Sequence, residues 1–152
     1  MFESFTKNTI KLDVAVNYVV GGCGPPILLL HGYPQTHFMW HKIANQLAEN
    51  YTVLASDLRG YGDSAKPPTN ELHCPYVKRA SARDQLMLMN ALGFRDFYLA
   101  GHDRGGCVGH RMTLDYEDAA TDVEGHAIPC GHYLAEEAPE ETLTAVLNFL
   151  EK

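Results

Sequence analysis

The chain has 152 residues, a formal net charge of −7 at pH 7, 45% hydrophobic residues and 20% charged residues. This length suits one domain, and the balance of residue types is that of a globular protein. The negative charge and the lack of a lysine or arginine cluster argue against a nucleic-acid partner. The first residues, MFESFTKNTIKLD, carry charges and no apolar core, and the longest apolar run is too short to span a bilayer. We therefore expect a cytoplasmic protein with no membrane partner.

Cysteine and histidine spacing bears on redox state and on metal binding. The four cysteines show no C-x-x-C spacing, which favours free thiols in a reducing compartment. The histidines form no H-x-x-x-H pattern and no Cys/His cluster with ligand spacing. The sequence therefore predicts neither a metal site nor a cofactor.

Three strands and one helix are predicted in the first third of the chain. "TIKLDVAVNYVVGG" is rich in β-branched residues and predicts two antiparallel strands with a turn near Asp13. The continuous apolar run over residues 27–30 is typical of a strand buried on both faces. Met39, Ile43 and Leu47 recur every four residues, which predicts a helix over residues 38–50.

Strands and helices alternate through the rest of the chain. "YTVLASDLRG" predicts a strand, and a helix over residues 77–92 is closed by Gly93. A strand over 94–100 leads into a helix from Arg104, and a weak strand is expected over 123–128. Pro139 opens a final helix. Four glutamates lie at its start, where we expect them to be solvated and to compensate the helix dipole: Glu136, Glu137, Glu140 and Glu141.

This order of elements indicates the fold class. Strands that alternate with helices predict an α/β fold with a mainly parallel sheet, helices on both faces and antiparallel N-terminal strands, in a single domain over 1–152. Active groups of such sheets lie at the carboxyl ends of the strands. Three loops meet that description, at residues 31–34, 101–105 and 131–133.

The loop "GHDRG" has a pattern that ordinary turns do not require. Small residues two places on either side of Asp103, between a predicted strand and helix, are typical of a nucleophile elbow. A carboxylate there is ionised at neutral pH, is favoured by the helix N-terminus, and can attack carbon to form an ester. The alternative is a plain turn or N-cap aspartate.

Two further loops supply groups that such a nucleophile needs. In "HGYPQ", the backbone N–H of Tyr33 is expected to form an oxyanion hole together with the backbone N–H of Arg104. "CGHYLAEE" offers His132 as the base that activates water for cleavage of the ester, although a simple loop histidine is the alternative.

The sequence resembles the α/β-hydrolase superfamily. "LLLHGYPQTHFMW", "DLRGYGDSAKP", "GHDRGG" and "GHYLAEEAPEET" resemble the haloacetate (fluoroacetate) dehalogenases in particular. The resemblance implies Asp103 as nucleophile, His132 as base and Arg104 as a clamp for the substrate carboxylate. Three further residues are expected substrate contacts: His31, Trp40 and Cys107. The alternatives are a support of the oxyanion loop for His31, a core residue or pocket wall for Trp40, and a small packing residue for Cys107. Arg104 could instead pair with a nearby acid.

The sequence departs from that family in two places. Cys107 stands where the family usually carries a second arginine, and a thiol cannot replace a bidentate guanidinium contact. Further core strands and the helical cap have no counterpart, so we infer a deletion junction near residues 118–122. No triad acid can be nominated from the three aspartates in this region: Asp115, Asp118 and Asp122.

These observations predict a hydrolase of the haloacetate-dehalogenase type in a shortened form without a cap, acting on a haloacid or small ester. Two alternatives stay open, namely a non-catalytic scaffold that serves binding or oligomerisation only, and an esterase for small esters. Because the strand over 94–100 lacks its expected neighbours, we also expect a homo-oligomer, with exchange of the last strand and helix between chains as one route to it.

Overall fold

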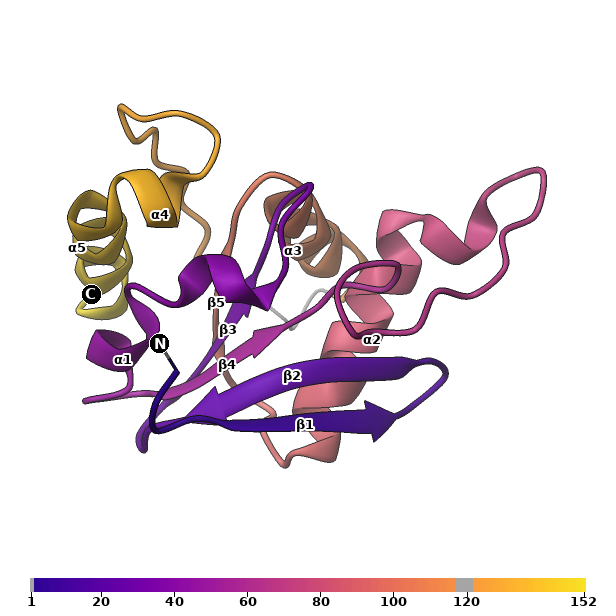
Figure 1. Cartoon of the computed structure of the whole chain (residues 1–152), viewed down its shortest axis with the longest axis horizontal. Coiled ribbons are helices and arrows are strands. Elements are labelled where there is room, and N and C mark those ends of the chain that lie inside the picture. The colour runs from indigo at the N-terminus through magenta and orange to yellow at the C-terminus, as the bar shows by residue number, and fades with distance from the viewer. Residues whose placement is uncertain (1, 117–121) are drawn as a thin grey trace.

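Five strands form one sheet in the computed structural model, which describes residues 2–116 and 122–152 (Figure 1). Their order across the sheet is β1-β2-β4-β3-β5. The strands span β1 Thr6–Lys11, β2 Ala15–Gly21, β3 Pro26–Leu30, β4 Thr52–Ser56 and β5 Tyr98–Gly101.

Strand direction follows the sequence prediction. β1 pairs with β2, and β2 with β4, in antiparallel register, whereas β3 pairs with β4 and with β5 in parallel. The sheet is therefore mixed, with a parallel core and antiparallel N-terminal strands, as the α/β prediction required. β5 begins at Tyr98, four residues later than expected.

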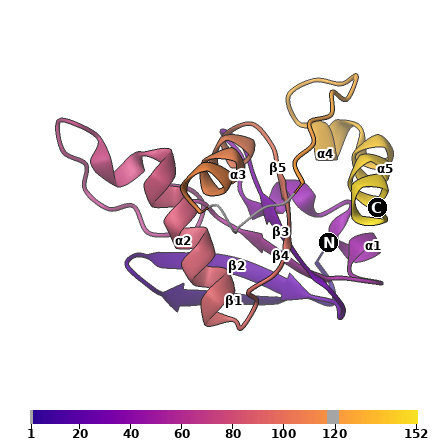
Figure 2. The ribbon, with the colours of Figure 1, turned by 180° about the vertical axis from the view of Figure 1, so that it is seen from behind.

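Helices cover both faces of the sheet (Figure 2). They are η1 His37–Trp40, α1 Ala44–Leu47, η2 Cys74–Tyr76, α2 Lys78–Ala91, α3 Arg104–Asp115, α4 Leu134–Glu137 and α5 Pro139–Leu150. Gly93 follows α2 with a φ of 86°, the left-handed conformation that its predicted role at the helix end needs. Within the described ranges, no helix combines the length and apolarity that a membrane crossing would take.

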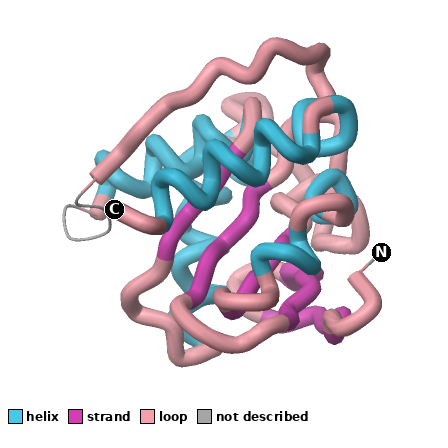
Figure 3. Tube along the Cα trace, turned by 90° about the vertical axis from the view of Figure 1, so that its left-hand side faces the viewer, coloured by secondary structure: helices cyan, strands magenta, loops and turns pink. Residues whose placement is uncertain are grey.

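The apolar run over residues 27–30 shows how the helices on each face pack against the sheet. Ile27 and Leu29 pack in the core shared with α1 and α5, whereas Leu28 and Leu30 pack in the core shared with α2 and α3. Alternate side chains of a strand point to opposite faces, so β3 is buried on both sides, as predicted. Figure 3 shows the strands running alongside one another with helices packed around them.

The predicted helix over 38–50 is broken in two. Met39, Ile43 and Leu47 are buried as expected, but the backbone forms the 3-10 turn η1 and then the short α1. The Phe38 carbonyl accepts the N–H of His41 at 3.0 Å and faces that residue's Nδ1 at 2.9 Å. Because this carbonyl is taken three residues on, the four-residue ladder of an α-helix does not start there.

The weak strand expected over 123–128 is wrong, because these residues form no strand. Gly125 and His126 interrupt its apolar pattern, and Val123 is largely exposed. β5 consequently pairs with β3 alone among the described residues, and its other edge is open. Most of the inferred junction near 118–122, Asp118 included, lies outside the described residues.

Candidate active site

Asp103 lies on a strained turn between β5 and α3. Its φ of 47° and ψ of −110° fall where few residues with a side chain are found. A Cβ on Gly101 would lie 2.6 Å from the carbonyl carbon of Gly105, and one on Gly105 would lie 2.2 Å from the Leu30 oxygen. Both flanking glycines are therefore required by close backbone approach, as the elbow interpretation predicts.

The Asp103 carboxylate is held by backbone N–H groups. The N–H of Tyr33 donates to Oδ2 at 2.8 Å. Burial raises the pKa of Asp103, but the hydrogen bonds from the N–H groups of Tyr33 and Arg104 outweigh it and hold the pKa below its usual value. Asp103 is thus ionised at neutral pH, and the two predicted oxyanion donors face its carboxylate.

His31 fixes the loop that carries Tyr33 and does not face a substrate. Its ring is fully buried; Nε2 accepts the N–H of Leu58 at 3.0 Å, and Nδ1 lies 2.9 Å from the Gly32 carbonyl oxygen. This pairing fits the neutral tautomer with the proton on Nδ1, and burial lowers the pKa of His31 accordingly. Both ring nitrogens are occupied, so the expected substrate contact by His31 does not fit its placement.

Asp57 organises the same region, although the sequence analysis did not single it out. Its buried carboxylate accepts the Nδ2 group of Asn17 at 2.9 Å, the N–H of Asp63 at 2.9 Å, and both the N–H and Nδ1 of His37 at 2.8 and 2.7 Å. Burial raises the pKa of Asp57, but the hydrogen bonds from His37 and Asp63 hold it well below its usual range. The carboxylate thereby joins the loops that follow β3 and β4.

His132 lies beside the nucleophile. Its Nε2 is 4.0 Å from Asp103 Oδ2 and 2.5 Å from the Tyr33 carbonyl oxygen. A carbonyl oxygen only accepts, so the second contact places a proton on Nε2. The His132 side chain is 48% exposed and that of Asp103 36% exposed, which leaves both open to water. The fold thus brings these two residues together, but Nε2 must leave Tyr33 before it can take a proton.

No triad acid orients His132 among the residues that the structure describes. The Asp115 carboxylate pairs with Arg79 at 2.8 Å and also with Arg111. Asp122 is exposed and follows the undescribed segment. The one described carboxylate that is recorded within ion-pair distance of His132 is Asp103 itself.

The remaining predicted substrate residues are placed differently from one another. The Arg104 guanidinium lies 5.5 Å from the centre of the exposed Tyr33 ring. Cys107 is exposed on the first turn of α3, and its N–H is bonded to the Asp103 carbonyl. Trp40 is 2% exposed and belongs to the core between the sheet and α5, and it lines the same cavity as Asp103.

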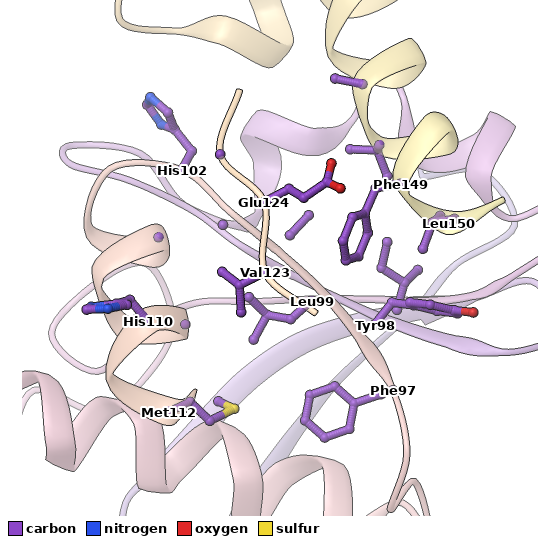
Figure 4. Close-up of a pocket in the computed structure, with 18 of the residues that line it drawn as sticks. Phe97, Tyr98, Leu99, His102, His110, Met112, Val123, Glu124, Phe149 and Leu150 are labelled. Carbon is purple, nitrogen blue, oxygen red and sulfur yellow. The ribbon is translucent and has the colours of Figure 1, made fainter. Parts of the chain in front are cut away.

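A cavity of about 1010 Å³ lies along the open edge of β5 (Figure 4). Residues of α3 line one side and residues of α5 the other, and the lining is largely apolar, including Phe97, Leu99 and Phe149. Asp103 and His102 also line the cavity, so it reaches the elbow. The space is where a sheet would add its next strand, since it sits beside an edge and between two helical layers.

The chain matches the alpha/beta hydrolase fold family over residues 25–139, a range that includes both Asp103 and His132. It is similar to the fluoroacetate dehalogenase of Burkholderia sp, with 53% identity over 120 residues. That alignment covers 78% of this chain and 40% of the relative, so the chain spans less than half the length of this relative.

Two solved structures give the same result in three dimensions. A protein from Nostoc sp PCC 7120, classed as an α/β hydrolase, matches with a TM-score of 0.75 and 52% identity, over 77% of this chain and 40% of its own. A protein from Pseudomonas aeruginosa, described as an epoxide hydrolase, matches with a TM-score of 0.72 and 37% identity. The second match covers 97% of this chain and 59% of that protein.

Proposed function

Since this chain belongs to the alpha/beta hydrolase fold family, we propose that it is a hydrolase in which Asp103 attacks a carbon atom that bears a leaving group. The observation that carries the proposal is the Asp103 carboxylate itself, strained on the elbow and held by the N–H of Tyr33 at 2.8 Å. We assign a haloacetate as the substrate, because its carboxylate suits the guanidinium of Arg104. The similarity to the Burkholderia fluoroacetate dehalogenase supports that choice.

The first step is a displacement. A carboxylate oxygen of Asp103 forms a bond to the substrate carbon, the carbon–halogen bond breaks, and the halide leaves with the electron pair. The guanidinium of Arg104 attracts the carboxylate of the haloacid and brings the carbon to the nucleophile.

The second step is hydrolysis of the ester. Water attacks Cγ of Asp103, His132 takes its proton, and the developing oxyanion is stabilised by the N–H groups of Tyr33 and Arg104. The bond between Cγ and the ester oxygen, which came from Asp103, then breaks, and the proton on His132 passes to that oxygen of the departing hydroxy acid. The Asp103 carboxyl group, which now holds the water oxygen, releases its remaining proton to solvent and is again a carboxylate. Because Nε2 of His132 faces the Tyr33 carbonyl and no described acid orients the ring, we expect this step to be the slower one.

Mass spectrometry on the tryptic peptide of residues 96–104 tests the proposal. This peptide holds Asp103 and no cysteine, so carboxymethylation of the four free thiols by a haloacetate does not interfere. After an acid quench, we expect the parent and His132→Ala to carry one carboxymethyl group on Asp103, and Asp103→Asn to carry none. An unmodified parent peptide at high substrate would instead support the non-catalytic scaffold.

A further inference from the structure

Glu137 holds the backbone on both sides of His132. Its Oε2 accepts the N–H of Gly131 at 2.7 Å, and its Oε1 accepts the N–H of Tyr133 at 3.0 Å. We propose that Glu137 is a positioning residue for His132. Its two hydrogen bonds hold the backbone that carries the imidazole ring, whereas no described side-chain acid hydrogen-bonds to the ring itself. The proposal rests on the proposed function, because it assigns His132 a position that matters for ester hydrolysis.

The two hydrogen bonds to the backbone require a carboxylate at position 137. Each oxygen takes one of the two flanking N–H donors, so both must be acceptors. A glutamine in the same place offers one acceptor and turns an NH₂ group toward the second donor. Gly131 is part of the arrangement, since a Cβ there would lie 2.4 Å from Oε2 of Glu137.

The helix that carries Glu137 is itself fixed in place. Ala135 of α4 is fully buried in the core, and Lys42 Nζ donates to the backbone carbonyl of Glu136 at 2.5 Å. Thr142 of α5 donates its hydroxyl to the Ala138 carbonyl at 2.7 Å. Figure 1 shows α4 against α5, with the preceding loop reaching away from them. Glu137 thus connects this loop to a helix that is packed into the core.

The His132 ring contacts the loop that carries Tyr33 and the turn that carries Asp103. His132 Nε2 lies 2.5 Å from the Tyr33 carbonyl, and the His132 ring centre is 5.0 Å from that of His102, the neighbour of Asp103 in the chain. A shift of the backbone at 131–133 would therefore move the imidazole relative to the ester carbon. A misplacement of about 1 Å is enough to cost on the order of a hundred-fold in rate.

The test compares Glu137→Gln with Glu136→Gln, a neighbour whose contact with Lys42 runs through its backbone and not its carboxylate. We expect Glu137→Gln to speed amide exchange at Gly131 and Tyr133, to move the imidazole NMR signals of His132, and to slow ester hydrolysis by about ten-fold or more. Formation of the ester on Asp103 should be unchanged in both variants. A purely structural role would not separate hydrolysis from formation in this way.

A second pair guards against a variant that fails to fold. Gly131→Ala displaces Oε2 while Glu137 is kept, whereas a Cβ on Gly125 has no atom within 4 Å. We expect Gly131→Ala to reproduce the exchange and NMR changes and Gly125→Ala to leave them as in the parent. Indistinguishable spectra and exchange in Glu137→Gln and Glu136→Gln would overturn the proposal. These readouts need no turnover, so they judge Glu137 even if no ester ever forms on Asp103, which would defeat the proposed function alone.

Discussion

Gly105→Ala and Gly106→Ala are adjacent substitutions on α3 with opposite expected effects. A Cβ at position 105 would lie 2.2 Å from the Leu30 carbonyl oxygen, whereas at position 106 the nearest atom is the Gly101 oxygen at 3.3 Å. Either alanine gains about 1 kcal/mol of helix propensity over glycine. At position 105, backbone of β3 or α3 must move by about 1 Å, and overpacking of this kind costs about 3 kcal/mol.

The balance predicts that Gly105→Ala lowers the free energy of unfolding by about 2 kcal/mol, which for a chain of this size lowers Tm by about 4–8 °C. Gly106→Ala should be neutral or gain up to about 1 kcal/mol. Urea and thermal unfolding followed by circular dichroism measure both. Because the Gly105 N–H is bonded to the His102 carbonyl, Gly105→Ala should also slow ester formation on Asp103. Equal stabilities of the two variants would refute the close approach of α3 to β3 on which the elbow depends.

Three further predictions concern selectivity, pH and assembly. Cys107→Arg restores a second guanidinium and should lower KM for haloacetates, relative to neutral esters, by about ten-fold, with Cys107→Met as the uncharged control; an unchanged ratio would dispose of this prediction. Burial lowers the pKa of His31, so its share of stability is present above about pH 6.5 and is lost as pH falls toward the folded pKa. His31→Gln should therefore flatten the decline of the urea midpoint between about pH 7 and 5, and an unaltered decline would contradict this. Light scattering at micromolar concentration should show a dimer or larger species, since the edge of β5 is open; a monomer across a hundred-fold dilution would rule out strand exchange.

The parallel core and the elbow were predictable because their signals are local. The apolar run of β3 and the glycines around Asp103 constrain the backbone within a few residues, whatever the rest of the chain does. The break between η1 and α1 was not predictable, because the periodicity of buried residues is the same in a bent segment as in a straight helix.

The two carboxylates that hold the site loops, Asp57 and Glu137, could not be identified from the spacing of residues in the sequence. Asp57 and Glu137 act through contacts with segments that only the fold brings near, and an acidic residue at a helix has a simpler interpretation as a solvated charge. One signal was present for Asp57, since a carboxylate that directly follows a buried strand lies at the edge of the sheet where the other site loops meet. The burial of His31 and Trp40 likewise depends on neighbours from distant segments.

The central claim is that Asp103 forms and then releases an ester, and the fate of the water oxygen tests it most directly. The protein is incubated with a haloacetate in water enriched in the heavy oxygen isotope, and the peptide of residues 96–104 is then weighed. Because water attacks Cγ of the ester, we expect heavy oxygen to enter the Asp103 carboxylate of the parent as turnover proceeds, and Asp103→Asn to show neither turnover nor label. Hydroxy acid formed by the parent with no heavy oxygen in the peptide would contradict the account, as would the absence of both product and label.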